Sequence, residues 1–159
     1  MYVDNTSNES VETGSASSGA SVFWFAAGGA LIVLDQWLKH FFFSRNFSWS
    51  MQPWLQLVQF QNDKFAFSIP LRPAIIFSIY AVVLGILILY VHRNYKHFRT
   101  WDFFGWTLIF AGSVSNIAER IIFDYVRDYL SLYGGSVINA ADIYIVVGLL
   151  ILILAKPKK

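Results

Sequence analysis

The sequence contains no cysteine and few charged residues. Without cysteine the chain forms no disulfide, no thiolate nucleophile and no cysteine-ligated metal site, and it is not itself a lipoprotein acylated on cysteine. Asp, Glu, Lys and Arg make up 14 % of its 159 residues, whereas a soluble domain carries about 25 %. It also lacks a basic cluster interleaved with aromatic residues, so no nucleic-acid partner is expected. With 56 % hydrophobic residues, the composition indicates a single-domain integral membrane protein.

Four apolar stretches are long enough, at about 20 residues, to cross a membrane as helices. They cover residues 22–43, 73–91, 101–123 and 137–155. Residues 1–21 are rich in Ser, Asn, Thr and Gly and bury little apolar area, so we expect a disordered cytoplasmic tail there. The sequence therefore predicts an all-α integral membrane protein whose domain, residues 22–159, contains four transmembrane helices.

The connection between the first two predicted helices, residues 44–72, is too long for a simple turn. Its segment 54–60 alternates apolar and polar residues, which predicts a small β-element on the outer membrane surface. Basic residues mark cytoplasmic loops, and three each lie in segment 92–100 and in the C-terminal tail. Both termini are therefore placed in the cytoplasm, although basic residues also lie on the opposite side.

With this topology, four acidic residues gather near the outer face of the membrane: Asp35, Glu119, Asp128 and Asp142. An ionisable group in a membrane span costs at least ~2.5 kcal/mol at the bilayer centre and therefore indicates a functional site. Structural roles are the alternative. Asp35 and Lys39 are spaced i, i+4 and can neutralise each other, with Lys39 reaching outward to the headgroups. Asp128 can be a solvated loop residue, and Asp142 can be a first-turn acid favoured by the helix dipole.

Four short motifs follow one another from about residue 23 to the end of the chain. They are Asp35-Gln-x-x-Lys39; Asn62 through Ala66-Phe67; Asn116-Ile-Ala-Glu-Arg120 followed by Val126-Arg-Asp-Tyr129; and Asn139-Ala-Ala-Asp142. This ordered set resembles the lipoprotein signal peptidase (signal peptidase II) family. The resemblance implies an aspartyl endopeptidase of the bacterial cytoplasmic (inner) membrane, active near the outer face. It implies a prolipoprotein substrate with a diacylglyceryl cysteine, cleaved just before that cysteine.

The resemblance also assigns residues to roles. It places the catalytic pair on Asp128 and Asp142. The positions that support the pair or bind substrate are Asn116, Arg120, Asn139, Asp35, Lys39, Asn62 and Glu119. The chain departs from the family pattern at Glu119, where Asp is usual, and at Lys64, where Gly is usual, and also at Ser115 and Tyr129. None of these departures falls on the catalytic pair. Membrane lipid is an expected partner, and the protein is expected to be a monomer.

Two neighbouring carboxyl groups suit peptide hydrolysis, because they cannot both ionise cheaply and one therefore stays protonated. Which one holds the proton is a property of the pair. No metal or other cofactor is expected, since the three histidines are dispersed and no nucleotide-binding glycine loop is present. A serine–lysine hydrolase using Lys39 or Lys64 stays open. So do a small transporter or channel subunit that uses the carboxylates for ions or protons, and a structural protein held together by paired charges. Crowding of the acids on one side argues against the transporter.

Overall fold

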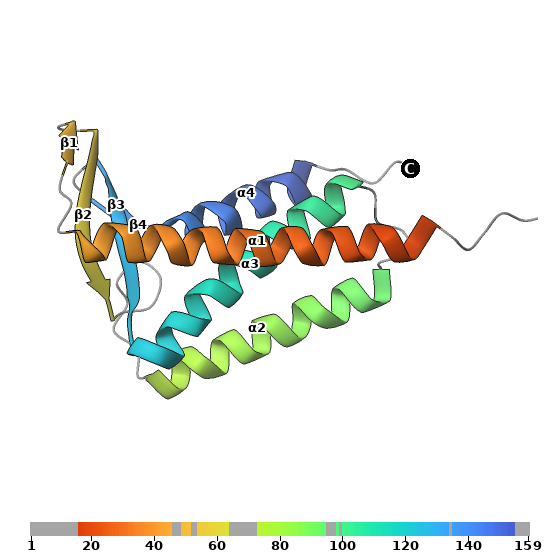
Figure 1. The fold of residues 1–159 in the computed structure, drawn as a ribbon. Coiled ribbons are helices and arrows are strands. Elements are labelled where there is room, and N and C mark those ends of the chain that lie inside the picture. Colours follow the sequence, from red (N-terminus) through yellow and green to blue (C-terminus); the bar gives the residue numbers. More distant parts are fainter. Residues whose placement is uncertain are drawn as a thin grey trace, which may run out of the picture.

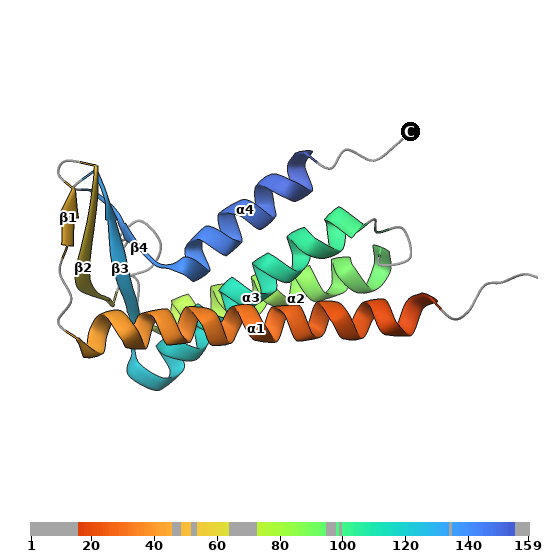
Figure 2. The same cartoon turned by 45° about the horizontal axis from the view of Figure 1, so that its top comes forward.

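The computed structural model describes residues 16–45, 49–51, 54–63, 73–94, 98, 100–133 and 135–154. In this part of the chain four helices run alongside one another, and an antiparallel sheet lies across one end of them (Figures 1 and 2). The helices are α1 (Ala16–Ser44), α2 (Pro73–Asn94), α3 (Thr100–Phe123) and α4 (Ala140–Leu154). The strands are β1 (Trp49–Met51), β2 (Leu55–Asn62), β3 (Val126–Leu132) and β4 (Val137–Ile138).

The four predicted helices are present, with shifted ends. Helix α1 begins at Ala16, six residues before the predicted start, and residues 1–15 of the predicted tail lie outside the described residues. Helix α4 begins at Ala140, because Val137 and Ile138 pair with β3 as strand β4. Among the described residues, the segment Val22–Ser44 of α1 is long and apolar enough to cross a membrane, and α4 is apolar but shorter.

The sheet is larger than the sequence predicted. Its strand order is β1-β2-β3-β4, so both segments at this end of the helices contribute to it, and the description of the chain as all-α with β-structure only in the first loop is corrected. Strand β2 pairs with β3 in the register Phe60↔Asp128 and Asn62↔Val126. Because β3 follows α3 and β4 precedes α4, the sheet is joined to the ends of both helices that carry the site.

Helices α3 and α4 approach closely through small residues. A Cβ atom on Gly148 would lie 2.6 Å from the carbonyl oxygen of Gly105, and one on Gly112 would overlap the carbonyl oxygen of Ala141. Small residues allow helix backbones to pack this tightly where water does not drive helices together. The contact at Ala141 holds the first turn of α4, which carries Asp142, directly against α3.

Candidate active site

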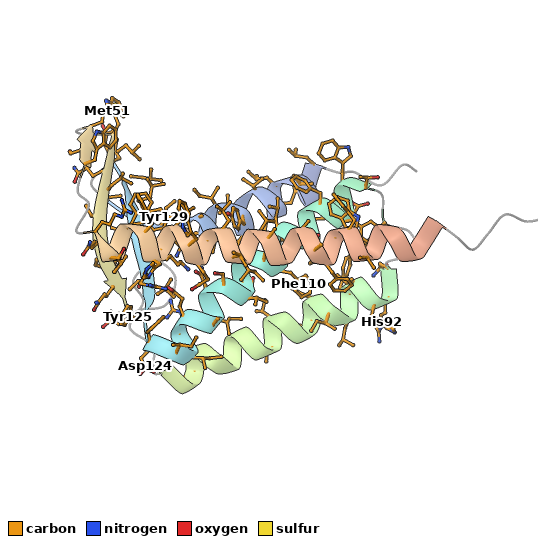
Figure 3. The ribbon with its side chains drawn as sticks, viewed as in Figure 1. Met51, His92, Phe110, Asp124, Tyr125 and Tyr129 are labelled. Carbon is orange, nitrogen blue, oxygen red and sulfur yellow. The ribbon has the colours of Figure 1, made fainter. Side chains whose placement is uncertain are left out.

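The site lies at the start of α4, between α3 and strand β3, in the region where Figure 3 labels Tyr129. Asp128 lies in β3 with 1 % of its side chain surface exposed. Asp142 lies in the first turn of α4. Asp128 is therefore a buried strand residue, and it is not the solvated loop residue that the sequence alone left open.

Asn139 connects the two carboxyl groups. Its side-chain Nδ2 donates to Asp128 Oδ1 (2.6 Å), and its backbone N–H donates to Asp142 Oδ2 (3.1 Å). In return, Asn139 Oδ1 accepts the backbone N–H of Asp142 (3.0 Å). This reciprocal pair is a capping box that starts α4. Asp142 thus helps to start α4, as its position in the first turn suggests. Its carboxyl group is also connected to that of Asp128 through Asn139.

Two further asparagines, Asn62 and Asn116, also donate hydrogen bonds to the two carboxyl groups. Asn62 Nδ2, at the end of β2, donates to Asp128 Oδ2 (2.8 Å). Asn116 Nδ2, in α3, donates to Asp142 Oδ1 (2.9 Å). The orientation of the Asn116 amide is fixed because its Oδ1 accepts from Lys39 Nζ (2.8 Å) and from Asn139 Nδ2 (3.2 Å). Each carboxyl group therefore receives hydrogen bonds on both of its oxygens.

Asp35 and Lys39 form a buried ion pair behind these amides. Lys39 Nζ lies 2.9 Å from Asp35 Oδ2, and both side chains are 0 % exposed, so the expectation that Lys39 reaches the headgroups is wrong. Asp35 also accepts hydrogen bonds from the hydroxyl of Ser115 (2.6 Å) and the backbone N–H of Ala141 (2.9 Å). Burial of an ion pair is tolerated when such bonds satisfy its remaining polar atoms. This pair joins α1 to α3 and α4.

Glu119 and Arg120 are adjacent in α3, so their side chains cannot face each other. Glu119 lies 3.6 Å from Lys39 Nζ and accepts hydrogen bonds from the backbone N–H (2.8 Å) and the side-chain Nε (2.6 Å) of Arg127. Arg127 also stacks over the ring of Phe123 and contacts Gln36 Oε1 (3.4 Å). Arg120 is buried in the last turn of α3.

The surroundings of Asp128 favour its protonated form. Burial raises the pKa of Asp128 from 3.8 to about 6; the negative charge of Asp142 also raises it, while hydrogen bonds from Asn62 and Asn139 and the charge of Lys39 oppose the shift. Burial also raises the pKa of Tyr129, which keeps its hydroxyl neutral. That hydroxyl accepts the backbone N–H of Ala140 (3.1 Å). A carboxyl group with a pKa near 6 can hold or release a proton close to neutral pH.

All nine predicted site residues fall within the described part of the chain. Five of them, Asp128, Asp142, Asn62, Asn116 and Asn139, form one hydrogen-bonded group. Asp35, Lys39 and Glu119 lie directly behind it. Sequence reasoning assigned no role to Arg127 or to the hydroxyls of Ser115 and Tyr129, since their partners become neighbours only in the fold. Lys64 lies outside the described residues.

Lys39 is surrounded by partners that suit a structural cation. Its Nζ contacts Asp35, Asn116 and Glu119, so it is the counter-ion of two carboxylates. Ser115 Oγ donates its proton to Asp35 and accepts from Gln36 Nε2 (2.8 Å). These contacts do not favour the serine–lysine hydrolase at Lys39, because its Nζ is engaged by carboxylates instead of facing a serine hydroxyl.

Comparison with known proteins shows the class of the fold and then the family. Two solved structures described as a bacterial membrane enzyme match the chain with TM-scores of 0.72 and 0.71 at 20 % sequence identity, and the first match covers 89 % of this chain and 94 % of the other. The chain therefore shares the fold of these membrane-enzyme structures. The family model described as signal peptidase (SPase) II matches residues 28–156. The chain belongs to the signal peptidase II family.

Curated relatives agree with this assignment. The lipoprotein signal peptidase of Streptococcus thermophilus is 36 % identical over 132 residues, which is 79 % of this chain and 86 % of the relative. That of Streptococcus pneumoniae is 31 % identical over 136 residues, 81 % of this chain and 88 % of the relative. That of Bartonella henselae is 30 % identical over 115 residues, 64 % of this chain and 66 % of the relative. The protein is thus a protease with a signal peptidase II function in lipoprotein processing, and the transporter alternative is not favoured.

Proposed function

We propose that this protein is an aspartic-type endopeptidase in which Asp128 and Asp142 form the catalytic pair. The observation that carries the proposal is the bridge made by Asn139, which donates hydrogen bonds to both carboxyl groups. Carboxyl groups that share one asparagine are close enough for each charge to disfavour the other. The pair then carries one proton near neutral pH, and its two members have opposite protonation states.

This division of roles fits peptide hydrolysis. The ionised carboxylate accepts a proton from a water molecule, whose oxygen attacks the scissile carbonyl carbon. The protonated carboxyl group donates its proton to the carbonyl oxygen, which gives a neutral tetrahedral intermediate. Collapse of this intermediate breaks the C–N bond. The carboxyl group that took a proton from water gives it to the leaving amine, and the other carboxylate takes a proton from a hydroxyl group of the intermediate as the product carboxylic acid forms. The pair again carries one proton, in the same arrangement as at the start.

The substrate that fits is a prolipoprotein with a diacylglyceryl cysteine, cut just before that cysteine. The curated relatives are named lipoprotein signal peptidases, which supports a lipoprotein substrate. The site lies at the end of the apolar helices and beside the sheet, a depth at which the end of a membrane-spanning signal peptide would meet it. The enzyme is proposed to work as a monomer, because donors from α3, β2 and the N-cap of α4 in the same chain already reach every oxygen of both carboxyl groups, so the site needs no residue of a second copy.

The proposed setting is the bacterial cytoplasmic membrane, crossed by four helices. The N-terminal end of α1 and the C-terminal end of α4 both lie away from the sheet (Figure 1), which supports a placement of both termini in the cytoplasm and of the site near the outer face. Trp49, Trp54 and Tyr133 on the sheet are 46 %, 62 % and 68 % exposed. Exposed Trp and Tyr side chains favour the membrane–water interface, so the sheet is placed there.

Separate replacement of the two aspartates tests the proposal. Asp128→Asn and Asp142→Asn are assayed in lipid with a diacylglyceryl-cysteine peptide, with Asp63→Asn as the control because Asp63 is an exposed carboxylate just beyond Asn62. Each site variant is expected to lose about 10²–10⁴-fold in cleavage rate while the control keeps full activity. Full activity in either site variant would exclude its catalytic role. A chelator is expected to leave the rate unchanged; inactivation that zinc reverses would instead indicate a metal-dependent reaction.

A further inference from the structure

One carboxylate fastens the start of strand β3 to the end of helix α3. Glu119 accepts the backbone N–H of Arg127 through Oε2 (2.8 Å) and the side-chain Nε of Arg127 through Oε1 (2.6 Å). Nη2 of the same guanidinium also contacts Oε1. Arg127 immediately precedes Asp128, so this contact fixes the backbone from which the Asp128 side chain extends.

The extra methylene of Glu119 allows this double contact. Its Oε2 also lies 3.6 Å from Lys39 Nζ, so one side chain of α3 reaches both α1 and β3. An aspartate would withdraw the carboxylate by roughly 1.5 Å, the length of one C–C bond, and would lose part of these contacts. Arg127 occupies the x position of the Val-x-Asp motif and lies directly before Asp128.

The charges around the pair cancel. Lys39 lies between Asp35 (2.9 Å) and Glu119 (3.6 Å), and Arg127 binds Glu119. Two cations therefore face two anions, and none of the four side chains is more than 14 % exposed. Water screens charges weakly at such positions. Removal of one charge would consequently leave a net charge of the opposite sign next to the two aspartates.

We propose that Glu119 and Arg127 are positioning residues for the carboxyl pair. They fix the start of β3, and by neutralising each other they allow Asp128 and Asp142 to share one proton near neutral pH. An unopposed Arg127 would favour ionisation of both aspartates, and an unopposed Glu119 would favour protonation of both. This inference rests on the proposed catalytic function of the two aspartates.

The elements around the aspartates contribute several charged or titratable groups. Helix α1 contributes Asp35 and Lys39, α3 contributes Glu119, α4 contributes Tyr144, and β3 contributes Arg127 and Tyr129. Strand β2 contributes only the neutral amide of Asn62. Glu119 and Arg127 suit the test because glutamine removes the charge of either residue; it keeps the length of Glu119 and shortens Arg127. Neither residue is among the side chains that donate hydrogen bonds to Asp128 and Asp142.

The test compares pH profiles of kcat/KM for wild type, Glu119→Gln, Arg127→Gln and the double variant, in one lipid and with one diacylglyceryl peptide. Glu119→Gln is expected to move the profile to lower pH and Arg127→Gln to higher pH, each by on the order of one unit. The double variant is expected to return close to the wild-type profile. Glu119→Asp keeps the charge, so its profile stays in place while kcat falls.

A purely structural role would lower activity at every pH without displacing the profile. Unshifted profiles, or shifts of both single variants in the same direction, would overturn the proposal. If Glu119→Gln alone does not fold, Arg127→Gln is still expected to shift the profile to higher pH, and the double variant is still expected to match the wild type. Asp128→Asn and Asp142→Asn are measured in the same series. Full activity in either would reject the catalytic pair itself, whereas strongly impaired Asn variants with unshifted Glu119 and Arg127 profiles would reject only the positioning role.

Discussion

Replacing Asn139 with alanine is expected to weaken the fold and the chemistry together. Asn139 is 0 % exposed; its side chain donates to Asp128 Oδ1 (2.6 Å) and caps α4 by accepting the backbone N–H of Asp142 (3.0 Å). Loss of an N-cap costs about 1 kcal/mol, and loss of a hydrogen bond to a charged group costs about 1.5–3 kcal/mol. The free energy of unfolding should therefore fall by about 2.5–4 kcal/mol, an upper bound because bonds in one network are not independent.

The same substitution should displace the pH dependence of cleavage. The hydrogen bond from Asn139 lowers the pKa of Asp128, which is about 6 in the intact site. Without that bond the pKa rises further, because the ionised form loses a donor while burial continues to penalise it. A larger fraction of Asp128 is then protonated at neutral pH, and the kcat/KM profile should move to higher pH.

Two measurements check this expectation. Tryptophan fluorescence during unfolding in detergent reports the stability, and cleavage of a diacylglyceryl peptide between about pH 5 and about pH 8 reports the profile. Asn94→Ala is the matched control, because Asn94 also bonds at a helix end, to the carbonyl of Tyr90 (2.8 Å), but far along the chain from the site. An Asn139→Ala protein whose profile is unshifted and whose stability lies within about 0.5 kcal/mol of wild type would refute the reasoning.

Two further predictions concern stability and membrane position. Raising the pH from about 4 to about 7 should lower the unfolding free energy of the wild type by up to about 3 kcal/mol, because the folded pKa of Asp128, about 6, exceeds the unfolded value of 3.8. Asp128→Asn should lose most of this slope in thermal unfolding, and an unchanged slope would count against the buried carboxyl. Since the chain has no cysteine, spin labels on Trp54→Cys and Tyr133→Cys can be attached directly; in bilayers they should collide more with oxygen than with a water-soluble nickel chelate. A label on Asp63→Cys should show the reverse, and nickel-accessible labels at 54 and 133 would place the sheet in water.

The helices could be predicted because long apolar runs leave few alternatives in a membrane. Strand β2 was also predictable, since segment 54–60 alternates apolar and polar residues. Strand β3 was not, because Val126, Asp128 and Tyr129 are all buried and the strand has no period of two. Its neighbours Asp124 and Tyr133 have positive φ values of 64° and 52°. Turns with positive φ usually contain glycine. The turn after β3 is indicated by Gly134-Gly135, whereas the turn at Asp124 has no such sequence signal.

The motifs identified the residues of the candidate site but not how they are connected. The spacing of Asp35 and Lys39 correctly predicted an ion pair, because i, i+4 residues of a helix are neighbours. Glu119 and Arg120 are adjacent in the helix and cannot face each other, so each needs another partner. That the partner of Glu119 is Arg127 depends on the turn between α3 and β3, which brings residues eight positions apart into contact. The side-chain network therefore required the fold.

The arrangement separates the parts of the site that stabilise from the part that reacts. Asp35, Lys39, Glu119 and Arg127 are buried as compensated charges, and their contacts hold α1, α3, α4 and β3 together. Asp128 is different, because burial and Asp142 both disfavour its ionised form, and the amides of Asn62 and Asn139 only partly offset this. Ionisation of both aspartates is therefore costly among these neutralised charges. Because of that cost the pair keeps one proton, which is available for transfer. A protein selected for stability alone would fill these two positions with side chains that carry no such penalty.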